Sequence, residues 1–260
     1  MLAIKEQLKK KVVKSGNGGA VWVPKAWLGE EVVVILPEKP RLDVRERIIH
    51  QLEPHLKDIV SVSLYGSYAR GEQTQGSDVD VLVITQEKKH LHIQGLDILS
   101  ISLHQLQKAI VKYPVLYYHI IQEAQPLVNS PVLQELKKTK VTYKNFKNYL
   151  HETKEHLHSN KELVELDKLD GDMLRSTSVA YSSLLRLKGF YIIDCFVKKK
   201  VFTSAGFKQW LITHGLEKRE FDSAYAIYRG VRDGIAQKTR ISIATAEKML
   251  NLLEKELEKL

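Results

Sequence analysis

The stretch VSLYGSYARGEQTQGSDVDVLVI, residues 62–84, decides the fold of the central part of the chain. Two apolar runs, which are typical of strands, flank a segment rich in Gly, Ser and polar residues. The first run ends at Tyr65, just before Gly66 and Ser67. Glycine lets a backbone approach a ligand closely, and Ser67 is expected to cap the helix that follows. Because unpaired N–H groups at a helix start attract phosphate, this turn is predicted to bind phosphate.

Two carboxylates open the second apolar run. Asp78 and Asp80 follow Ser67 after ten intervening residues. Residues i and i+2 of a strand share a face, so both side chains are expected to project together beside the turn. Two like charges this close are costly unless a divalent cation neutralises them, and carboxylate and phosphate oxygens are the ligands that Mg²⁺ prefers.

A third carboxylate is expected on an adjacent strand. Asp97 stands alone in the apolar segment Leu96-Asp97-Ile98-Leu99, where it is either this ligand or a buried structural carboxylate. Arg70 either faces the phosphates or pairs with Glu72 on the helix surface. The pattern predicts a site for one or two magnesium ions beside a phosphate-binding turn.

The same stretch resembles the DNA polymerase β-like nucleotidyltransferase superfamily, particularly its minimal members, whose pattern is Gly-Ser, ten residues, then Asp-x-Asp. Gly66, Ser67, Asp78 and Asp80 match that pattern, and Ala69-Arg70-Gly71 and Ser77 match its common additions. The resemblance covers residues 41–130. It implies transfer of a nucleoside monophosphate from a nucleoside triphosphate, ATP above all. The residues it implies are Asp78, Asp80 and Asp97 for catalysis and a two-ion Mg²⁺ site, and Gly66, Ser67, Arg70 and Ser77 for the nucleotide.

Three compositional regimes predict an α+β protein with a separate all-α part. Apolar positions at helical spacing over 41–56 precede three apolar stretches at 59–64, 79–84 and 96–103, which indicates a mixed sheet with helices. Beyond residue 130 the periodicity is helical and ends in an apolar stripe over 246–260. We therefore expect a small β module at 1–38, a nucleotidyltransferase domain at 41–130 and a helical bundle at 131–260.

The first module alternates short β-branched runs with Gly and Pro over residues 11–36. It resembles the AbrB/SpoVT-like swapped-hairpin domains, found fused or alone in archaeal proteins, which generally pair as dimers and often bind DNA. The segment has too few apolar residues to bury a core alone, so a homodimer is predicted. Any DNA binding is expected to be weak and unspecific, through phosphate contacts of Lys9, Lys10, Lys11 and Lys14.

The last region resembles the HEPN-type and kanamycin-nucleotidyltransferase-type helical partner domains. Arg229 and Arg232 are either contacts for an acceptor or phosphate, or members of helix-surface ion pairs. Ribonuclease-active HEPN domains place a His four to six residues after an Arg, and no His follows either arginine here. We therefore expect no ribonuclease activity.

The composition and the net charge limit the classes of protein to which the chain can belong. The 260 residues are 43% hydrophobic and 27% charged, which excludes a disordered or collagen-like chain. The single cysteine, Cys195, excludes an internal disulfide, and the sequence has no signal peptide and no apolar run of membrane-spanning length, so a cytoplasmic, membrane-free protein is predicted. The net charge of +9 divides into +3 for residues 1–40, −1 for 41–130 and +7 for 131–260. Both ends are therefore able to meet a polyanion.

The leading hypothesis is magnesium-dependent nucleotidyl transfer to a hydroxyl of unidentified origin: a protein, as in antitoxins that adenylylate their toxin, a small molecule or an RNA end. The alternative is an AbrB-like DNA-binding regulator or antitoxin whose central domain senses nucleotide without turnover.

Overall fold

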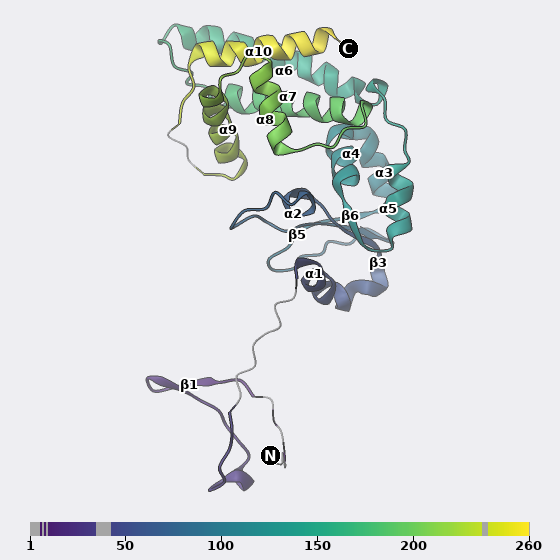
Figure 1. Ribbon diagram of the computed structural model, residues 1–260, viewed down its shortest axis with the longest axis vertical. Coiled ribbons are helices and arrows are strands. Elements are labelled where there is room, and N and C mark those ends of the chain that lie inside the picture. Colours follow the sequence, from purple (N-terminus) through teal and green to yellow (C-terminus); the bar gives the residue numbers. More distant parts are fainter. Residues whose placement is uncertain (1–5, 7, 9, 35–42, 236–238, 260) are drawn as a thin grey trace. The chain divides into compact units, whose positions relative to one another are not determined.

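The computed structural model describes residues 6, 8, 10–34, 43–235 and 239–259 (Figure 1). The chain divides into two compact units, residues 1–41 and residues 42–260. Lys9 and the predicted linker prolines, Pro37 and Pro40, lie outside the described residues.

The N-terminal unit contains a two-stranded antiparallel hairpin. Its strands are β1 (Val13–Ser15) and β2 (Gly18–Ala20), and a 3₁₀ turn, η1 (Lys25–Trp27), follows. Gly16 takes a positive φ of 57° in the two-residue loop, as such tight hairpin turns require. The expectation of short strands and tight turns is confirmed. None of the residues described between 6 and 34 is buried, so this unit has no core of its own there.

A four-stranded mixed sheet organises the second unit. Its strands are β3 (Ile59–Leu64), β4 (Asp80–Thr85), β5 (Asp97–Ser102) and β6 (Gln125–Val128), in the spatial order β5-β4-β3-β6. β3 pairs antiparallel with both β4 and β6, whereas β4 and β5 run parallel. The three strands predicted from apolar runs are confirmed to within a residue or two. β6 was not predicted, and it lies at the edge of the sheet, where its Pro126 costs no ladder bond in the interior.

Helices cover both faces of this sheet, which explains why β4 is apolar on both sides. Val81 and Val83 pack with Ile48 and Leu52 of α1 (Val44–Leu52). An Asp43–Glu46 capping box starts this helix, and the 3₁₀ segment η2 (Glu53–Asp58) follows it. Leu82 and Ile84 point to the opposite face. There they pack against α3 (Leu103–Lys112), α4 (Pro114–Glu123) and α5 (Ser130–Lys137).

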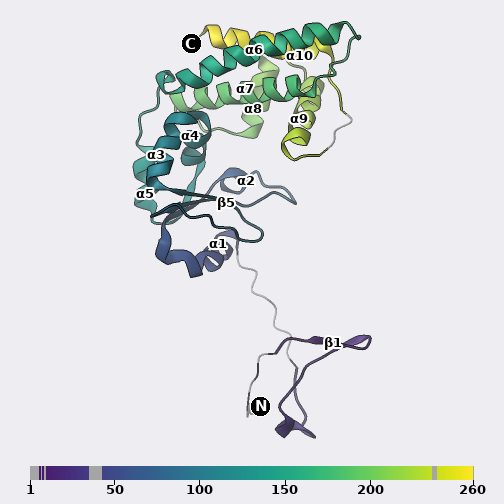
Figure 2. The ribbon, with the colours of Figure 1, turned by 180° about the vertical axis from the view of Figure 1, so that it is seen from behind.

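The C-terminal half is helical, as its periodicity predicts. It contains η3 (Tyr143–Phe146), α6 (Lys147–Lys168), α7 (Thr177–Val197), α8 (Ser204–Thr213), α9 (Lys218–Arg232) and α10 (Ile243–Glu258). Helices α6, α7 and α10 lie side by side in both views (Figures 1 and 2). They share one apolar core to which the predicted stripe contributes Met249, Leu250 and Leu253. None of the helices in the described ranges is long and apolar enough to cross a membrane.

Candidate active site

Two of the three predicted carboxylates lie on neighbouring strands. Asp80 is the first residue of β4, Asp97 is the first residue of β5, and the two are register partners in the parallel pair. The backbone N–H of Asp97 also donates to the carbonyl of Val79 at 2.9 Å, which fixes the start of the register. Asp78 precedes β4 by two residues and is exposed. The sheet therefore brings Asp80 and Asp97 together at one end of β4 and β5.

Negative charge is crowded around Asp80. Partial burial, together with repulsion from Asp97, Glu123 and Asp78, raises the pKa of Asp80 to about 6. Burial, together with repulsion from Asp80, Asp97 and Glu123, raises the pKa of the neighbouring phenol, Tyr65. A carboxylate that resists ionisation beside others like it gains most from a cation, because the cation removes the repulsion.

The donor chemistry of these residues suits magnesium, which takes carboxylate oxygens together with phosphate oxygens. Within the described ranges, no three His, Cys, Asp or Glu side chains are grouped closely enough to hold an ion. The negative charge around Asp80 and its register pairing with Asp97 therefore suit a divalent cation by charge and by ligand type. In the described ranges, however, three ligands do not lie close enough together to hold one.

The turn before the carboxylates requires glycine at position 66. Gly66 has a φ of 72°, and a Cβ at this position would clash with the Asp80 carboxylate. Glycine is thus needed twice, for its conformation and for the close approach of Asp80. The prediction that Ser67 caps the next helix is wrong: α2 (Gly66–Arg70) begins one residue before Ser67, with Tyr65 as N-cap and no side-chain capping bond. The positive φ of Gly66 and the place of Ser67 inside the helix account for this shift.

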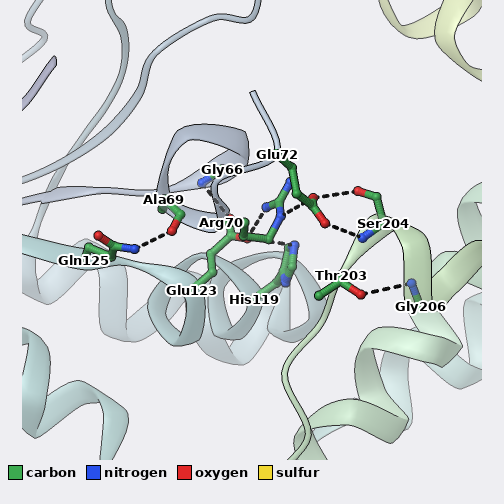
Figure 3. A network of polar contacts seen from close by, with 10 residues as sticks. All are labelled: Gly66, Ala69, Arg70, Glu72, His119, Glu123, Gln125, Thr203, Ser204 and Gly206. Carbon is green, nitrogen blue, oxygen red and sulfur yellow. Dashed lines mark hydrogen bonds and ion pairs between the residues drawn. The ribbon is translucent and has the colours of Figure 1, made fainter. Parts of the chain in front are cut away.

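The N–H of Gly66 already has an anionic partner. It donates to Glu123 Oε1 of α4 at 2.9 Å (Figure 3). The other oxygen, Oε2, pairs with the Arg70 guanidinium and lies 3.5 Å from His119 Nε2. Glu123 therefore holds both ends of α2. Sequence reasoning missed this residue because it lies more than 50 positions from Gly66 and Arg70, in a helix with no local signal for a site.

Arg70 also pairs with Glu72, through Nε to Oε2 at 2.8 Å. Burial opposes its charge, but Glu123 and Glu72 outweigh that effect and raise its pKa. The structure thus places Arg70 between two carboxylates. The pairing with Glu72 that was one of its two predicted roles is present, and a role at the phosphates stays a prediction.

The same network reaches the helical half of the unit. Glu72 accepts hydrogen bonds from the backbone N–H and the hydroxyl of Ser204, both at 2.9 Å, at the start of α8 (Figure 3). Arg70 also lies 5.7 Å from the Phe202 ring centre. Lys188 of α7 faces the same ring, and burial, with repulsion from Arg70 and Arg232, lowers its pKa to about 8. The two remaining predicted arginines, Arg229 and Arg232, both pair with Asp233.

Ser77, predicted to contact the nucleotide, lies away from this network. Its hydroxyl accepts from the backbone N–H of Thr74 at 2.9 Å and so closes the turn before β4. Ser77 lines a cavity of about 620 Å³ together with Asp78 and Asp97. The lining of this cavity does not include Gly66, Ser67 or Asp80.

Comparison with known proteins agrees with this arrangement. Residues 45–170 match the family model described as a nucleotidyltransferase domain. The match begins in α1 and ends just beyond α6, so it contains the whole sheet and the Gly66 turn. The nucleotidyltransferase resemblance of the sequence is confirmed at this level, whereas the AbrB-like and HEPN-like assignments stay predictions.

One curated relative is the "Putative protein adenylyltransferase" of Methanocaldococcus jannaschii. It is 42% identical over 48 residues, which are 17% of this chain and 48% of the relative, so the chain spans about half of that protein's length. Among solved structures, a nucleotidyltransferase-like protein from Exiguobacterium sibiricum 255-15 is 14% identical, with a TM-score of 0.36, covering 82% of this chain and 73% of that one.

Proposed function

We propose that this protein is a magnesium-dependent nucleotidyltransferase that moves the nucleoside monophosphate of an NTP, ATP in the first instance, to an acceptor hydroxyl. The observation that carries the proposal is the register pairing of Asp80 with Asp97, with Asp80 packed directly against Gly66. In this proposal Asp78, Asp80 and Asp97 hold two magnesium ions, and Gly66 and Ser67 contact the phosphates, with Arg70 and Ser77 in supporting contacts.

The chain's own residues have separable roles in the transfer. Gly66 lets the backbone of the turn approach the phosphates closely, and any side chain at this position would displace Asp80. The Asp97 carboxylate accepts the proton of the attacking hydroxyl, since it is exposed and faces the cavity described above. Bound magnesium would supply charge neutralisation for the carboxylates and for the departing pyrophosphate.

A protein hydroxyl is the acceptor that we propose, ahead of a small molecule or an RNA end. This proposal is supported by the curated relative that matches over 48 residues, because that relative is named a putative protein adenylyltransferase. We propose the cytoplasm as the location of this protein, as the sequence predicts.

We also propose that the N-terminal unit pairs two copies of the chain. Trp22, Val33 and Val34 are each at least 70% exposed, although apolar side chains of this size normally pack. Lys10, Lys11 and Lys14 are exposed as well and are available for weak, salt-sensitive contacts with DNA phosphates.

Pyrophosphate release tests the proposed activity. The purified protein, incubated with ATP, Mg²⁺ and cell lysate as a source of acceptor, should release pyrophosphate and label a protein with AMP, and the Asp78→Asn variant should do neither. Tight ATP binding with no release under any acceptor condition would instead support the nucleotide-sensing regulator.

A further inference from the structure

A cavity of about 620 Å³ opens beside the carboxylates. Its lining includes Asp78 and Asp97, together with Arg47 of α1, Tyr68 of α2 and His92 of the β4–β5 connection. Its size is in the range of sites that hold a small molecule or a protein side chain with its neighbours.

The strand order places Asp80 of β4 between the phosphate turn, which follows β3, and Asp97, which begins β5 and lines the cavity. Asp80 contacts Gly66, whereas its register partner Asp97 faces the cavity, and neither Gly66 nor Ser67 is in the lining. In phosphoryl and nucleotidyl transfer the attacking and leaving oxygens are roughly in line across the phosphorus. If the departing phosphates lie at the Gly66 turn, the acceptor must therefore enter from the cavity.

The charges of the cavity indicate what it selects. Arg47 is exposed, and within the described ranges it has no ion pair. It lines the same cavity as Asp78 and Asp97. Binding of single-stranded nucleic acid needs a basic track with several aromatic platforms, and this cavity presents one aromatic ring, Tyr68. One guanidinium beside two carboxylates suits a protein segment with a single acidic residue near its hydroxyl.

The geometry points to this cavity as the acceptor site, with Arg47 as the residue that selects a protein hydroxyl flanked by an acidic side chain. This inference rests on the proposed nucleotidyl transfer and deepens it. The acceptor oxygen forms a bond to the α-phosphorus as the bond from that phosphorus to the bridging oxygen of the β-phosphate breaks. The hydroxyl proton passes to Asp97, and pyrophosphate leaves with the bonding electron pair.

A peptide set with α-³²P-labelled ATP and Mg²⁺ tests the assignment on the full-length protein. Each peptide carries one Ser, Thr or Tyr flanked by Asp, Ala or Lys. The wild-type protein should label Asp-flanked peptides at least about tenfold better than Lys-flanked ones, since a charge-assisted pair contributes to one set alone. Arg47→Ala should lose this preference, and Arg47→Glu should shift it toward Lys-flanked peptides. Binding of a fluorescent ATP analogue should be unchanged in Arg47→Ala.

Lys108→Glu is the matched control, because Lys108 is an exposed cation on α3 that does not line the cavity. It should keep the wild-type preference. An Arg47→Ala protein with the wild-type preference would overturn the role of Arg47. Labelling confined to the 3′ ends of RNA oligonucleotides, or pyrophosphate release without any labelled peptide, would overturn the protein acceptor while leaving nucleotidyl transfer intact. Equal labelling by the Asp78→Asn protein would instead refute the proposed function.

Discussion

The central sheet and the N-terminal hairpin are both built from short strands, yet they differ in what they bury. Val81, Leu82, Val83 and Ile84 are each at most 1% exposed, because helices cover both faces of β4. In the hairpin unit Trp22 is 71% exposed and none of the described residues is buried. The sheet therefore supports itself and is able to hold charged groups at its end, whereas in our proposal the hairpin unit buries its apolar side chains against a second copy of the chain.

The largest expected effect tests the sheet end. Asp78→Asn or Asp80→Asn preserves the shape of the side chain and removes an anionic ligand. We expect turnover to fall at least ~100-fold, a loss of about 2.7 kcal/mol of transition-state stabilisation, with an unchanged circular dichroism spectrum. Asp97→Asn should behave similarly, through the loss of a ligand or of the proton acceptor. Near-normal turnover in Asp97→Asn alone would remove only that residue from the site.

The second prediction concerns the hairpin. Replacing Trp22 by Glu puts a charge into the proposed dimer contact, and a buried aromatic anchor is commonly worth about 2 kcal/mol or more. Light scattering at micromolar concentration should therefore show dimers of the wild-type protein and monomers of the variant. Pyrophosphate release per chain should stay unchanged. A wild-type protein that is monomeric at these concentrations would contradict the proposal that the hairpin unit pairs two copies of the chain.

The third prediction uses the crowding at Asp80. Since the pKa of Asp80 in the folded protein, about 6, exceeds its ordinary value of 3.8, ionisation costs stability as pH rises through this interval, and the full cost is present above it. In EDTA at pH 8, Asp80→Asn should raise the free energy of unfolding by about 1 kcal/mol, after allowance for solvent screening. At pH 3.5 the difference should be small, and added Mg²⁺ should stabilise only the wild type. Urea titrations at both pH values measure the free energy of unfolding. A variant that is less stable than the wild type at pH 8 would refute the repulsion between Asp80 and the neighbouring carboxylates.

The smallest expected effect is that of Ser67→Ala. Its hydroxyl does not cap α2, so its removal should leave stability within about 0.5 kcal/mol. A single hydroxyl contact with phosphate is worth about 0.5–1.5 kcal/mol, which predicts a few-fold rise in the KM for ATP with little change in kcat. Steady-state kinetics separate the two parameters, and a loss comparable to that of Asp78→Asn would assign Ser67 a larger role.

The sequence was informative where local pattern and chemistry coincide. The apolar runs located β3, β4 and β5, and they placed Asp80 at the first residue of β4, whereas Asp78 lies two residues before that strand. The position of Asp97 follows from the same strand reasoning, and the parallel register sets it beside Asp80. These features depend on residues close together in the chain, where periodicity carries the information.

The features that were missed depend on contacts between distant segments. Glu123 reaches the Gly66 N–H from α4, and Glu72 binds Ser204 at a sequence separation of 132 residues. Strand β6 contains Pro126, which weakens any strand prediction, and its edge position appears only in the folded sheet. The position of the helix start at Gly66 depends on a positive φ that the sequence does not specify by itself.

One measurement tests the central claim most directly: the fate of each phosphate of ATP. The protein is incubated with Mg²⁺ and cell lysate, once with ATP labelled at the α-phosphate and once with ATP labelled at the γ-phosphate. Nucleotidyl transfer predicts that the α-label becomes covalently attached to an acceptor, that the γ-label leaves as pyrophosphate, and that Asp80→Asn abolishes both. Attachment of the γ-label, or equal attachment of the α-label by the Asp80→Asn protein, would contradict the account.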